Sequence, residues 1–362
     1  MASPSEFDII QRYFSFSQDN TFPSASVSSS AQSIDSESQA IVAIGDDAAV
    51  LPASENPLVI ATDTLIEGVH FPYGFAAEAV ASRAMGVNLS DFAAMGAKPR
   101  WLTMALSLPN ADAEWLEKFS RQFEQQCKQY QVQLIGGDTT KGPLSISLTV
   151  LGETDSGQSQ LSDSVRSQLA AIRPNLLDDK AICLRRNGAK AGDDIWLSGS
   201  LGKGAAALAL ISADDIDLHC SEADKTQLIN SFNAPQPRLT LGAALLGLAN
   251  SAIDISDGLM ADAKHIADQS QVKIIIDGEA LPINAALKNY SNQAQLQEWV
   301  LAGGDEYELL FTVPAAYRSV VQSIVEWLAV DCTNIGSVEA GRGVTLVGEA
   351  WQANNKSGYT HF

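Results

Sequence analysis

Acidic residues of this sequence stand where short apolar runs end, often beside glycine. Five segments show the pattern: Ile44-Gly-Asp-Asp47, Ala61-Thr62-Asp63-Thr64, Ile135-Gly-Gly137-Asp138-Thr139-Thr140, Ile253-Asp254-Ile-Ser256-Asp257-Gly258 and Gly303-Gly-Asp305-Glu-Tyr-Glu308. Apolar runs of this length are typical of buried strands. Ligands of α/β sheets bind beyond strand ends, so we expect these carboxylates to meet in one cleft.

Such a cleft would suit a hard cation. Carboxylate oxygens without cysteine or paired histidine favour Mg²⁺ over Zn²⁺. Several aspartates held together repel one another, and bound divalent ions remove that repulsion. Because Mg²⁺ shares phosphate oxygens, it would let an acidic protein bind a nucleotide. The neighbouring glycines allow backbone N–H groups to approach phosphate, and threonine and serine hydroxyls add further ligands.

Each element also has a purely structural interpretation. A single Gly-Asp step is most often a turn in which aspartate accepts local N–H groups. Asn88 and Asp91 share one face of an apolar helical pattern, and that face either meets water or enters a polar site. His70 has no second histidine nearby, which favours a packing or surface role. Only the five acidic elements together favour a site.

Two further segments could contact phosphate. Gly199-Ser-Leu-Gly-Lys-Gly204 precedes an alanine-rich helical pattern, but it lacks the first glycine and the final Ser or Thr of a Walker A motif. We therefore interpret it as a strand-to-helix turn. Arg186 belongs to a small basic island, where it is either a surface residue or a phosphate clamp.

The composition excludes several functional classes. The 362 residues are enough for two domains, and 23 Lys plus Arg against 43 Asp plus Glu give a net charge of −20, which opposes nucleic-acid binding. The four cysteines are far apart and form no CxxC pair, so a reducing compartment is expected. The sequence shows neither a signal peptide nor an apolar stretch long enough for a membrane. We expect a cytoplasmic protein without membrane contact.

Strand-like and helix-like patterns alternate in both halves, which predicts an α/β (α+β) fold. The first half offers strands at 41–44, 58–61, 101–108, 132–135 and 144–151, a helix over 76–95, and a helix with Trp115, Phe119, Phe123 and Cys127 on one face. The second half offers strands at 194–198, 252–255, 273–277, 308–313 and 344–347, and helices at 203–212, 238–249, 258–268 and 315–328. We expect an N-terminal domain at 1–153, a polar connector at 154–180 with a short helix, and a C-terminal domain at 181–362.

The order of these motifs resembles the thiamine-monophosphate kinase family, within the wider group of aminoimidazole-ribonucleotide-synthetase-like ATP enzymes. The similarity rests on six segments spread over nearly the whole chain: Ile44-Gly-Asp-Asp-Ala-Ala-Val50, Thr62-Asp-Thr-Leu65 with Gly68-Val-His-Phe71, Val87-Asn-Leu-Ser-Asp-Phe-Ala-Ala-Met-Gly-Ala97, Leu134-Ile-Gly-Gly-Asp-Thr-Thr140, Ala252-Ile-Asp-Ile-Ser-Asp-Gly-Leu259 and Gly303-Gly-Asp-Glu-Tyr-Glu-Leu309.

The resemblance implies roles for individual residues. The positions that match the family's Mg²⁺ ligands are Asp47, Ala61 through its backbone, Thr62, Asp63, Asp91, Asp138, Asp254 and Asp257. Those that match ATP contacts are Gly137, Arg186 and Ser256, and those that match substrate contacts are His70, Asp305 and Tyr359. At residues 305 and 306 this chain has Asp-Glu where the family often has Glu-Asp.

The resemblance also implies an activity and an architecture. The activity is ATP-dependent phosphorylation of thiamine monophosphate to thiamine diphosphate, the final step in making that product, assisted by several Mg²⁺ ions. The architecture is a two-domain aminoimidazole-ribonucleotide-synthetase-like fold, in which strands of the N-terminal domain join those of a second subunit in a homodimer and the site lies between the domains. Because a phosphate nucleophile is ionised near pH 7, we assign no general base.

Two alternatives stay open at this point. A synthetase of the same fold that activates an amide with ATP would release ADP with a different substrate. The selenium enzyme and the hydrogenase-maturation relative need a reactive cysteine near one terminus, whereas the first cysteine here is Cys127 and the chain ends without one. A non-catalytic metal or nucleotide binder would hold ATP without turnover.

Overall fold

The computed structural model describes residues 6–16, 39–44, 48–154, 161–172, 183–212 and 216–351. Asp47 and Tyr359, both predicted site residues, lie outside these ranges. The chain divides into two compact units, the first made of Met1–Leu89 and Pro99–Glu153 and the second of Ser90–Lys98 and Thr154–Phe362. Helix α2 (Ala77–Met95) therefore contributes residues to both.

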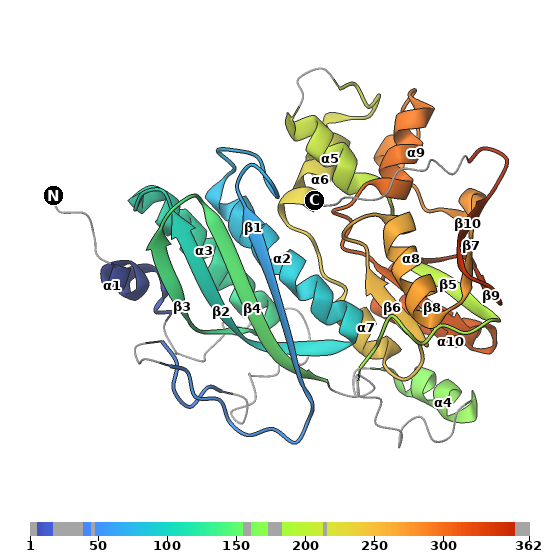
Figure 1. Ribbon diagram of the computed structural model, residues 1–362, viewed down its shortest axis with the longest axis horizontal. Coiled ribbons are helices and arrows are strands. Elements are labelled where there is room, and N and C mark those ends of the chain that lie inside the picture. Colours follow the sequence, from blue (N-terminus) through green and yellow to red (C-terminus); the bar gives the residue numbers. More distant parts are fainter. Residues whose placement is uncertain are drawn as a thin grey trace. The chain divides into compact units, whose positions relative to one another are not determined.

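The first unit is built on a four-stranded sheet. Its order is β1 (Leu58–Ile66), β4 (Ser145–Thr154), β2 (Ala97–Leu108) and β3 (Gln133–Lys141). β1 pairs antiparallel with β4, and β2 pairs parallel with β3. Buried and half-buried residues alternate along β4, as expected for a sheet with one covered face. Helices α2 and α3 (Ala113–Tyr130) cover that sheet from the same side (Figure 1).

Helix α3 forms for reasons visible in its sequence. Asp112 caps its N-terminus by accepting hydrogen bonds from the N–H groups of Glu114 and Trp115, and Gln131 ends it in the left-handed region. Its predicted apolar face is confirmed, since Phe119 and Phe123 are fully buried with stacked rings 5.7 Å apart. The N-terminal helical segment, α1 (Glu6–Ile9) and the π-helix η1 (Ile10–Phe14), adds Phe14, whose ring meets that of Phe119 edge-on at 6.2 Å.

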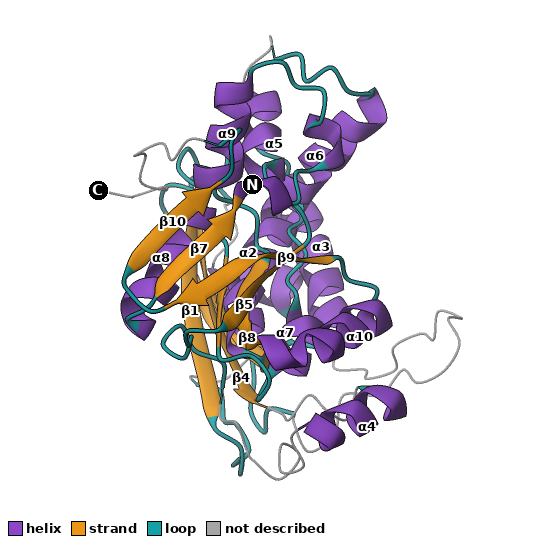
Figure 2. Cartoon of the chain, turned by 90° about the vertical axis from the view of Figure 1, so that its right-hand side faces the viewer, coloured by secondary structure: helices purple, strands orange, loops and turns teal. Residues whose placement is uncertain are grey.

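The second unit is built on a six-stranded sheet, seen in Figure 2. Its order is β10 (Gly343–Val347), β7 (Lys273–Asp277), β9 (Cys332–Glu339), β5 (Asp193–Ser198), β8 (Leu309–Pro314) and β6 (Ser251–Asp254). All neighbours are antiparallel except β10 and β7. β6 and β8 run in opposite directions, so the end of β6 adjoins the start of β8.

Helices and apolar side chains complete the second unit. The helices are α4 (Asp163–Ile172), α5 (Lys203–Ser212), α6 (Glu222–Asn233), α7 (Leu239–Leu245), α8 (Leu259–Ser270), α9 (Gln293–Ala302) and α10 (Arg318–Leu328), with 3₁₀ turns η4 (Gly278–Ala280), η5 (Ala285–Leu287) and η6 (Ala315–Tyr317). Phe311 of β8, Leu241 of α7 and Val321 of α10 share one core. Val165 of α4 joins that core, so the helix expected in the polar connector packs on the second unit.

The structure corrects several element predictions. The run at 41–44 forms isolated bridges in place of a strand, and one of them joins Val42 to Val50. Strand β9 and helices α6 and α9 were not predicted, although β9 lies inside the six-stranded sheet. Among the described residues, no helix has the length and apolar character needed to cross a membrane.

Candidate active site

The first group of predicted ligands lies on the edge strand β1. Ala61, Thr62 and Asp63 are consecutive there, and their partners on β4 are Val150, Thr149 and Leu148. The Asp63 N–H donates to Asn88 Oδ1 at 3.0 Å, and its Oδ1 accepts from the Thr64 N–H at 2.8 Å. Asn88 is fully buried and donates its Nδ2 to the Ala84 carbonyl at 2.9 Å. The structure thus gives Asn88 a positioning role for the Asp63 backbone.

The second group lies on β3, at the other edge of the same sheet. Gly137 pairs with Met104 of β2 and has φ 156°, and a Cβ there would lie 1.9 Å from the Met104 carbonyl oxygen. Only glycine fits so close a backbone approach. The next residue, Asp138, is exposed. Its carboxylate therefore faces solvent from a backbone that β2 holds in place.

Asp63 and Asp138 lie within strands, not after them. The expectation that every acidic element follows a strand end is therefore wrong for these two, because β1 continues to Ile66 and β3 to Lys141. Two strands, β4 and β2, separate them, which corresponds to about 14 Å at the usual strand spacing. Within this unit they cannot bind the same ion.

His70 occupies a tight turn after β1. Its Nδ1 accepts a hydrogen bond from the Ile66 N–H at 3.0 Å, and its carbonyl accepts from Arg83 Nε at 3.1 Å. An Nδ1 that accepts is unprotonated, so the neutral ring carries its proton on Nε2. Arg83 is almost fully buried. Hydrogen bonds to both the ring and the backbone carbonyl of His70 therefore hold the turn in place.

In the second unit, the predicted ligands meet at the end of β6. Asp254 is the last residue of that strand, is 5% exposed, and accepts a 2.7 Å hydrogen bond at Oδ2 from the Ser90 hydroxyl. Asp91, another predicted ligand, directly follows Ser90 on α2. Ser90 was not predicted as a site residue, although its place beside Asp91 in the Asn-Leu-Ser-Asp motif is a usable signal.

A third carboxylate, also missed from the sequence, supports the turn that follows β6. Asp262 of α8 accepts hydrogen bonds at Oδ2 from the N–H groups of Asp257 (3.2 Å) and Gly258 (3.1 Å). Burial, followed by the charges of Asp254 and Asp257, raises the pKa of Asp262 to about 7. Ligand atoms of Asp257, Asp262 and His265 lie within 4.8 Å of one another.

The segment 303–308 runs beside this turn. The Asp305 N–H donates to the Ser256 carbonyl at 3.0 Å, and the Tyr307 N–H donates to the Ile255 carbonyl at 2.8 Å. Asp305 and Tyr307 both have positive φ, 63° and 51°, and the Tyr307 hydroxyl donates to Asp305 Oδ1 at 2.8 Å. Left-handed conformations cost energy in such residues and often mark functional segments. The structure thus places Asp305 beside the segment that carries Asp254, Ser256 and Asp257.

Glu306 and Glu308, between and after these residues, serve the segment Gly199–Gly204. Glu308 is 1% exposed and bonded by Ser198, Lys203 and Arg238. Burial acts to raise the pKa of Glu308, but Lys203 and Arg238 outweigh it and hold this pKa below its usual value. The Gly202 N–H donates to Glu306 Oε1 at 2.6 Å. The interpretation of this segment as a strand-to-helix turn is confirmed, since β5 ends at Ser198 and α5 begins at Lys203.

Arg186 stands apart from the group at β6. Its side chain is exposed, and its carbonyl accepts from the hydroxyl of Ser270, the last residue of α8. Asp257 and Gly258 lie at the other end of that 12-residue helix, about 18 Å away at the usual helical rise. The structure does not bring Arg186 to these carboxylates.

Known protein families match both halves of the chain. Residues 45–154 match the family model for the AIR synthase related protein, N-terminal domain, and residues 190–349 match the corresponding C-terminal domain. The thiamine-monophosphate kinase of Haemophilus influenzae is 36% identical over 99% of this chain and 98% of its own length. The chain belongs to the thiamine-monophosphate kinase family. The predicted two-domain fold and the predicted family are both confirmed.

Solved structures of this kinase family share the fold. The thiamine-monophosphate kinase from Stenotrophomonas maltophilia K279a is 41% identical, with a TM-score of 0.74 over 86% of this chain and 92% of that one. The structure of AaThiL complexed with AMPPCP and TMP is 31% identical, with a TM-score of 0.68 over 88% and 92%. That kinase therefore binds an ATP analogue and TMP together on the same fold.

Proposed function

We propose that this protein is a kinase that transfers the γ-phosphoryl group of ATP to the phosphate of thiamine monophosphate, giving thiamine diphosphate and ADP. The observation that carries the proposal is the relationship to thiamine-monophosphate kinases over nearly the whole chain, together with the AaThiL complex containing AMPPCP and TMP. The acidic groups on β1, on β3 and at the end of β6 support it.

The donor set at the end of β6 fits Mg²⁺. Asp254 and Asp257 supply carboxylates, and Asp91 lies beside Ser90, which is bonded to Asp254. The raised pKa of Asp262 reflects burial and repulsion from Asp254 and Asp257, and a divalent cation would relieve that repulsion. In the first unit, Thr62, Asp63 and Asp138 offer further oxygen ligands. When bound at these residues, Mg²⁺ neutralises charge on the transferred phosphoryl group.

The chain's own contribution to catalysis is positioning. A phosphate oxygen of thiamine monophosphate attacks the γ-phosphorus in line, the bond from that phosphorus to the bridging oxygen breaks, and ADP leaves. Asn88 fixes the Asp63 backbone, Ser90 orients Asp254, and Asp262 holds the Asp257–Gly258 turn. We propose that His70, Asp305 and Tyr359 contact thiamine monophosphate. Gly137, Arg186 and Ser256 are the proposed ATP contacts, and Asp47 is a further proposed Mg²⁺ ligand. Such fixed geometry lowers the entropic part of the barrier.

Phosphorus NMR of the purified chain with ATP, Mg²⁺ and thiamine monophosphate tests the proposal. We expect the diphosphate signals of thiamine diphosphate to appear with ADP in a one-to-one ratio and to disappear when EDTA is added. ADP with free phosphate and no thiamine diphosphate would instead indicate a synthetase of the same fold. Nucleotide binding without turnover would indicate a binding protein.

We also propose that the protein is a homodimer joined through β1. This nine-residue strand pairs only with β4 among the described strands, so its other edge has unpaired backbone groups. Leu58 and Ile60 on it are 51% and 57% exposed, which is unusual for large apolar side chains of a strand. A second copy would cover both the edge and these side chains.

A further inference from the structure

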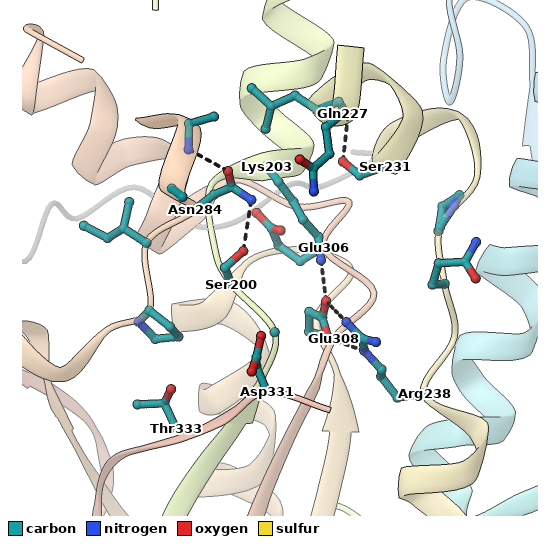
Figure 3. Close-up of a pocket in the computed structure, with 18 of the residues that line it drawn as sticks. Ser200, Lys203, Gln227, Ser231, Arg238, Asn284, Glu306, Glu308, Asp331 and Thr333 are labelled. Atoms are coloured by element: carbon teal, nitrogen blue, oxygen red, sulfur yellow. Dashed lines mark hydrogen bonds and ion pairs between the residues drawn. The ribbon is translucent and has the colours of Figure 1, made fainter. Parts of the chain in front are cut away.

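The second unit contains a pocket whose lining includes none of the predicted metal, ATP or substrate residues that the structure describes. It has a volume of about 670 Å³ and is enclosed by the start of α5, by α6, by the turn η5 and by the start of β9 (Figure 3). Polar residues on its wall include Lys203, Asp224, Gln227, Asn284, Asp331 and Thr333. The volume falls in the range of small-molecule sites.

The charges on this wall leave an excess of acid. The two cations, Lys203 and Arg238, both form ion pairs with the buried carboxylate of Glu308. Three further acidic groups line the pocket: Asp224 and Asp331, which add negative charge, and Glu306, which burial keeps protonated near pH 7 until a cation binds. The Gly202 N–H, which could otherwise bind an anion, donates to Glu306. A phosphate or carboxylate ligand would therefore meet repulsion, whereas a cation would be attracted.

One side-chain oxygen of Glu306 is buried without a hydrogen-bond partner among the described residues. Its side chain extends toward the side of the pocket where Asn284 and Ser200 lie (Figure 3). The residue is 3% exposed, and Oε2 is buried with no hydrogen-bond partner in the described part of the chain. Burial raises the pKa of Glu306 to about 8. Buried polar atoms without partners are rare and costly, and once Glu306 is ionised its Oε2 can be satisfied only by a ligand that donates a hydrogen bond.

We propose that this pocket binds a small organic cation with a primary ammonium or guanidinium group, which donates to Glu306 Oε2 and is attracted by Asp224 and Asp331. Asp305, the described substrate contact expected in this unit, does not line the pocket. Asp305 and Tyr307 bond each other and the backbone beside Ser256, and neither lines the pocket, whereas Glu306 and Glu308 do. Cation binding favours the ionised form of Glu306, so a proton leaves that carboxyl group on binding near pH 7.

Calorimetric titration of the full chain with agmatine tests this proposal directly. Saturating Mg²⁺-AMPPCP and thiamine monophosphate are present throughout, so that agmatine cannot bind in their place. We expect one saturable site and, from titrations in two buffers of different ionisation enthalpy, release of up to one proton per agmatine. Glu306→Gln keeps the shape of the side chain but removes its charge, and we expect about tenfold weaker binding and no proton release.

A matched pair of variants, one directly before β9 and one at its end, provides the control. Asp331→Asn and Glu339→Gln each remove one exposed carboxylate, but only Asp331 lines the pocket. We expect weaker agmatine binding for the first and unchanged binding for the second, and this pair decides the matter if Glu306→Gln does not fold. Absence of saturable agmatine binding in the presence of AMPPCP and thiamine monophosphate, or equal binding by Asp331→Asn and Glu339→Gln, would overturn the proposal.

Discussion

The hydroxyl of Ser90 donates a 2.7 Å hydrogen bond to Oδ2 of Asp254, across 164 residues of sequence. Both side chains are buried, so the bond fixes the last residue of β6 against α2. A hydrogen bond to a buried carboxylate is stronger than one between neutral groups.

Removing that bond should affect both stability and activity. We expect Ser90→Ala to lower the free energy of unfolding by about 1.5 to 3 kcal/mol, because the Asp254 carboxylate loses a buried partner. The Mg²⁺ concentration needed for half-maximal kinase activity should rise. Urea denaturation and a Mg²⁺ titration measure the two effects, with Ser319→Ala on the exposed face of α10 as control. If Ser90→Ala left both the free energy of unfolding and the Mg²⁺ dependence unchanged, Ser90 would not position Asp254.

The predicted metal ligands of the first unit can be tested without disturbing the sheet. We expect Asp63→Asn or Asp138→Asn to abolish turnover and to leave thermal unfolding cooperative, because amide and carboxylate have the same shape but differ in charge. ADP release and thermal denaturation are the measurements. Asp268→Asn, at an exposed position of α8, should keep normal activity. Near-normal turnover in both first-unit variants would contradict the assignment of Mg²⁺ to β1 and β3.

The buried ion pairs of Glu308 should outweigh any exposed pair. We expect Glu308→Gln to destabilise the protein by about 3 to 5 kcal/mol, since it leaves Lys203 and Arg238 without their buried counter-charge. The exposed pair of Glu114 and Lys118 on α3 offers a matched comparison, and Glu114→Gln should change the free energy of unfolding far less than Glu308→Gln. If urea denaturation showed that both variants lose the same free energy of unfolding, burial would not strengthen the ion pairs of Glu308.

Glu306 should make stability depend on pH. The pKa of Glu306 is raised from 4.5 to about 8 by burial, so the folded chain holds this proton while the unfolded chain releases it. Stability therefore falls as pH rises from about 4.5 to about 8, because the unfolded state binds fewer protons in that window. Glu306→Gln should flatten this decline in denaturation curves recorded with EDTA. The exposed Glu339→Gln should leave it unchanged, and a decline of wild-type size in Glu306→Gln would refute the prediction.

The proposed dimer makes its own prediction. Ile60→Lys places a charge on the exposed apolar side of β1, and we expect it to convert the dimer to a monomer in light scattering. Val69 is also exposed in the first unit but lies in the turn after β1, so Val69→Lys should leave the dimer intact. A monomeric wild-type protein would refute the proposed homodimer outright.

The strongly patterned elements were predictable from sequence, and those with mixed patterns were not. The aromatic face of α3 follows a clear helical period, and β8 is a continuous buried, mostly apolar run. β9 mixes Cys332, Asn334 and Ser337 with apolar residues, yet it lies between β7 and β5, because close backbone pairing tolerates small polar residues there. Helix α6 does carry a usable signal, the capping box of Ser221 and Asp224.

The acidic motifs identified the site region but not its support. Asp254, Ser256, Asp257 and Asp305 are adjacent because β6 and β8 are antiparallel neighbours, a fact of topology. Asp262 was missed because in the sequence it is one more polar residue on an amphipathic helix. Its role is visible only in the structure, where the N–H groups of Asp257 and Gly258 donate to its side chain.

The four residues from Asp305 to Glu308 alternate between two neighbourhoods, and this alternation constrains how the sequence can change. Asp305 and Tyr307 bond on the side of Ser256, while Glu306 and Glu308 bond on the side of Gly202 and Lys203. Inserting or deleting one residue here would exchange the two sets and put buried glutamates where substrate contacts are expected. Substitutions can be accepted at these positions one at a time, whereas a change of length must be compensated on both sides at once.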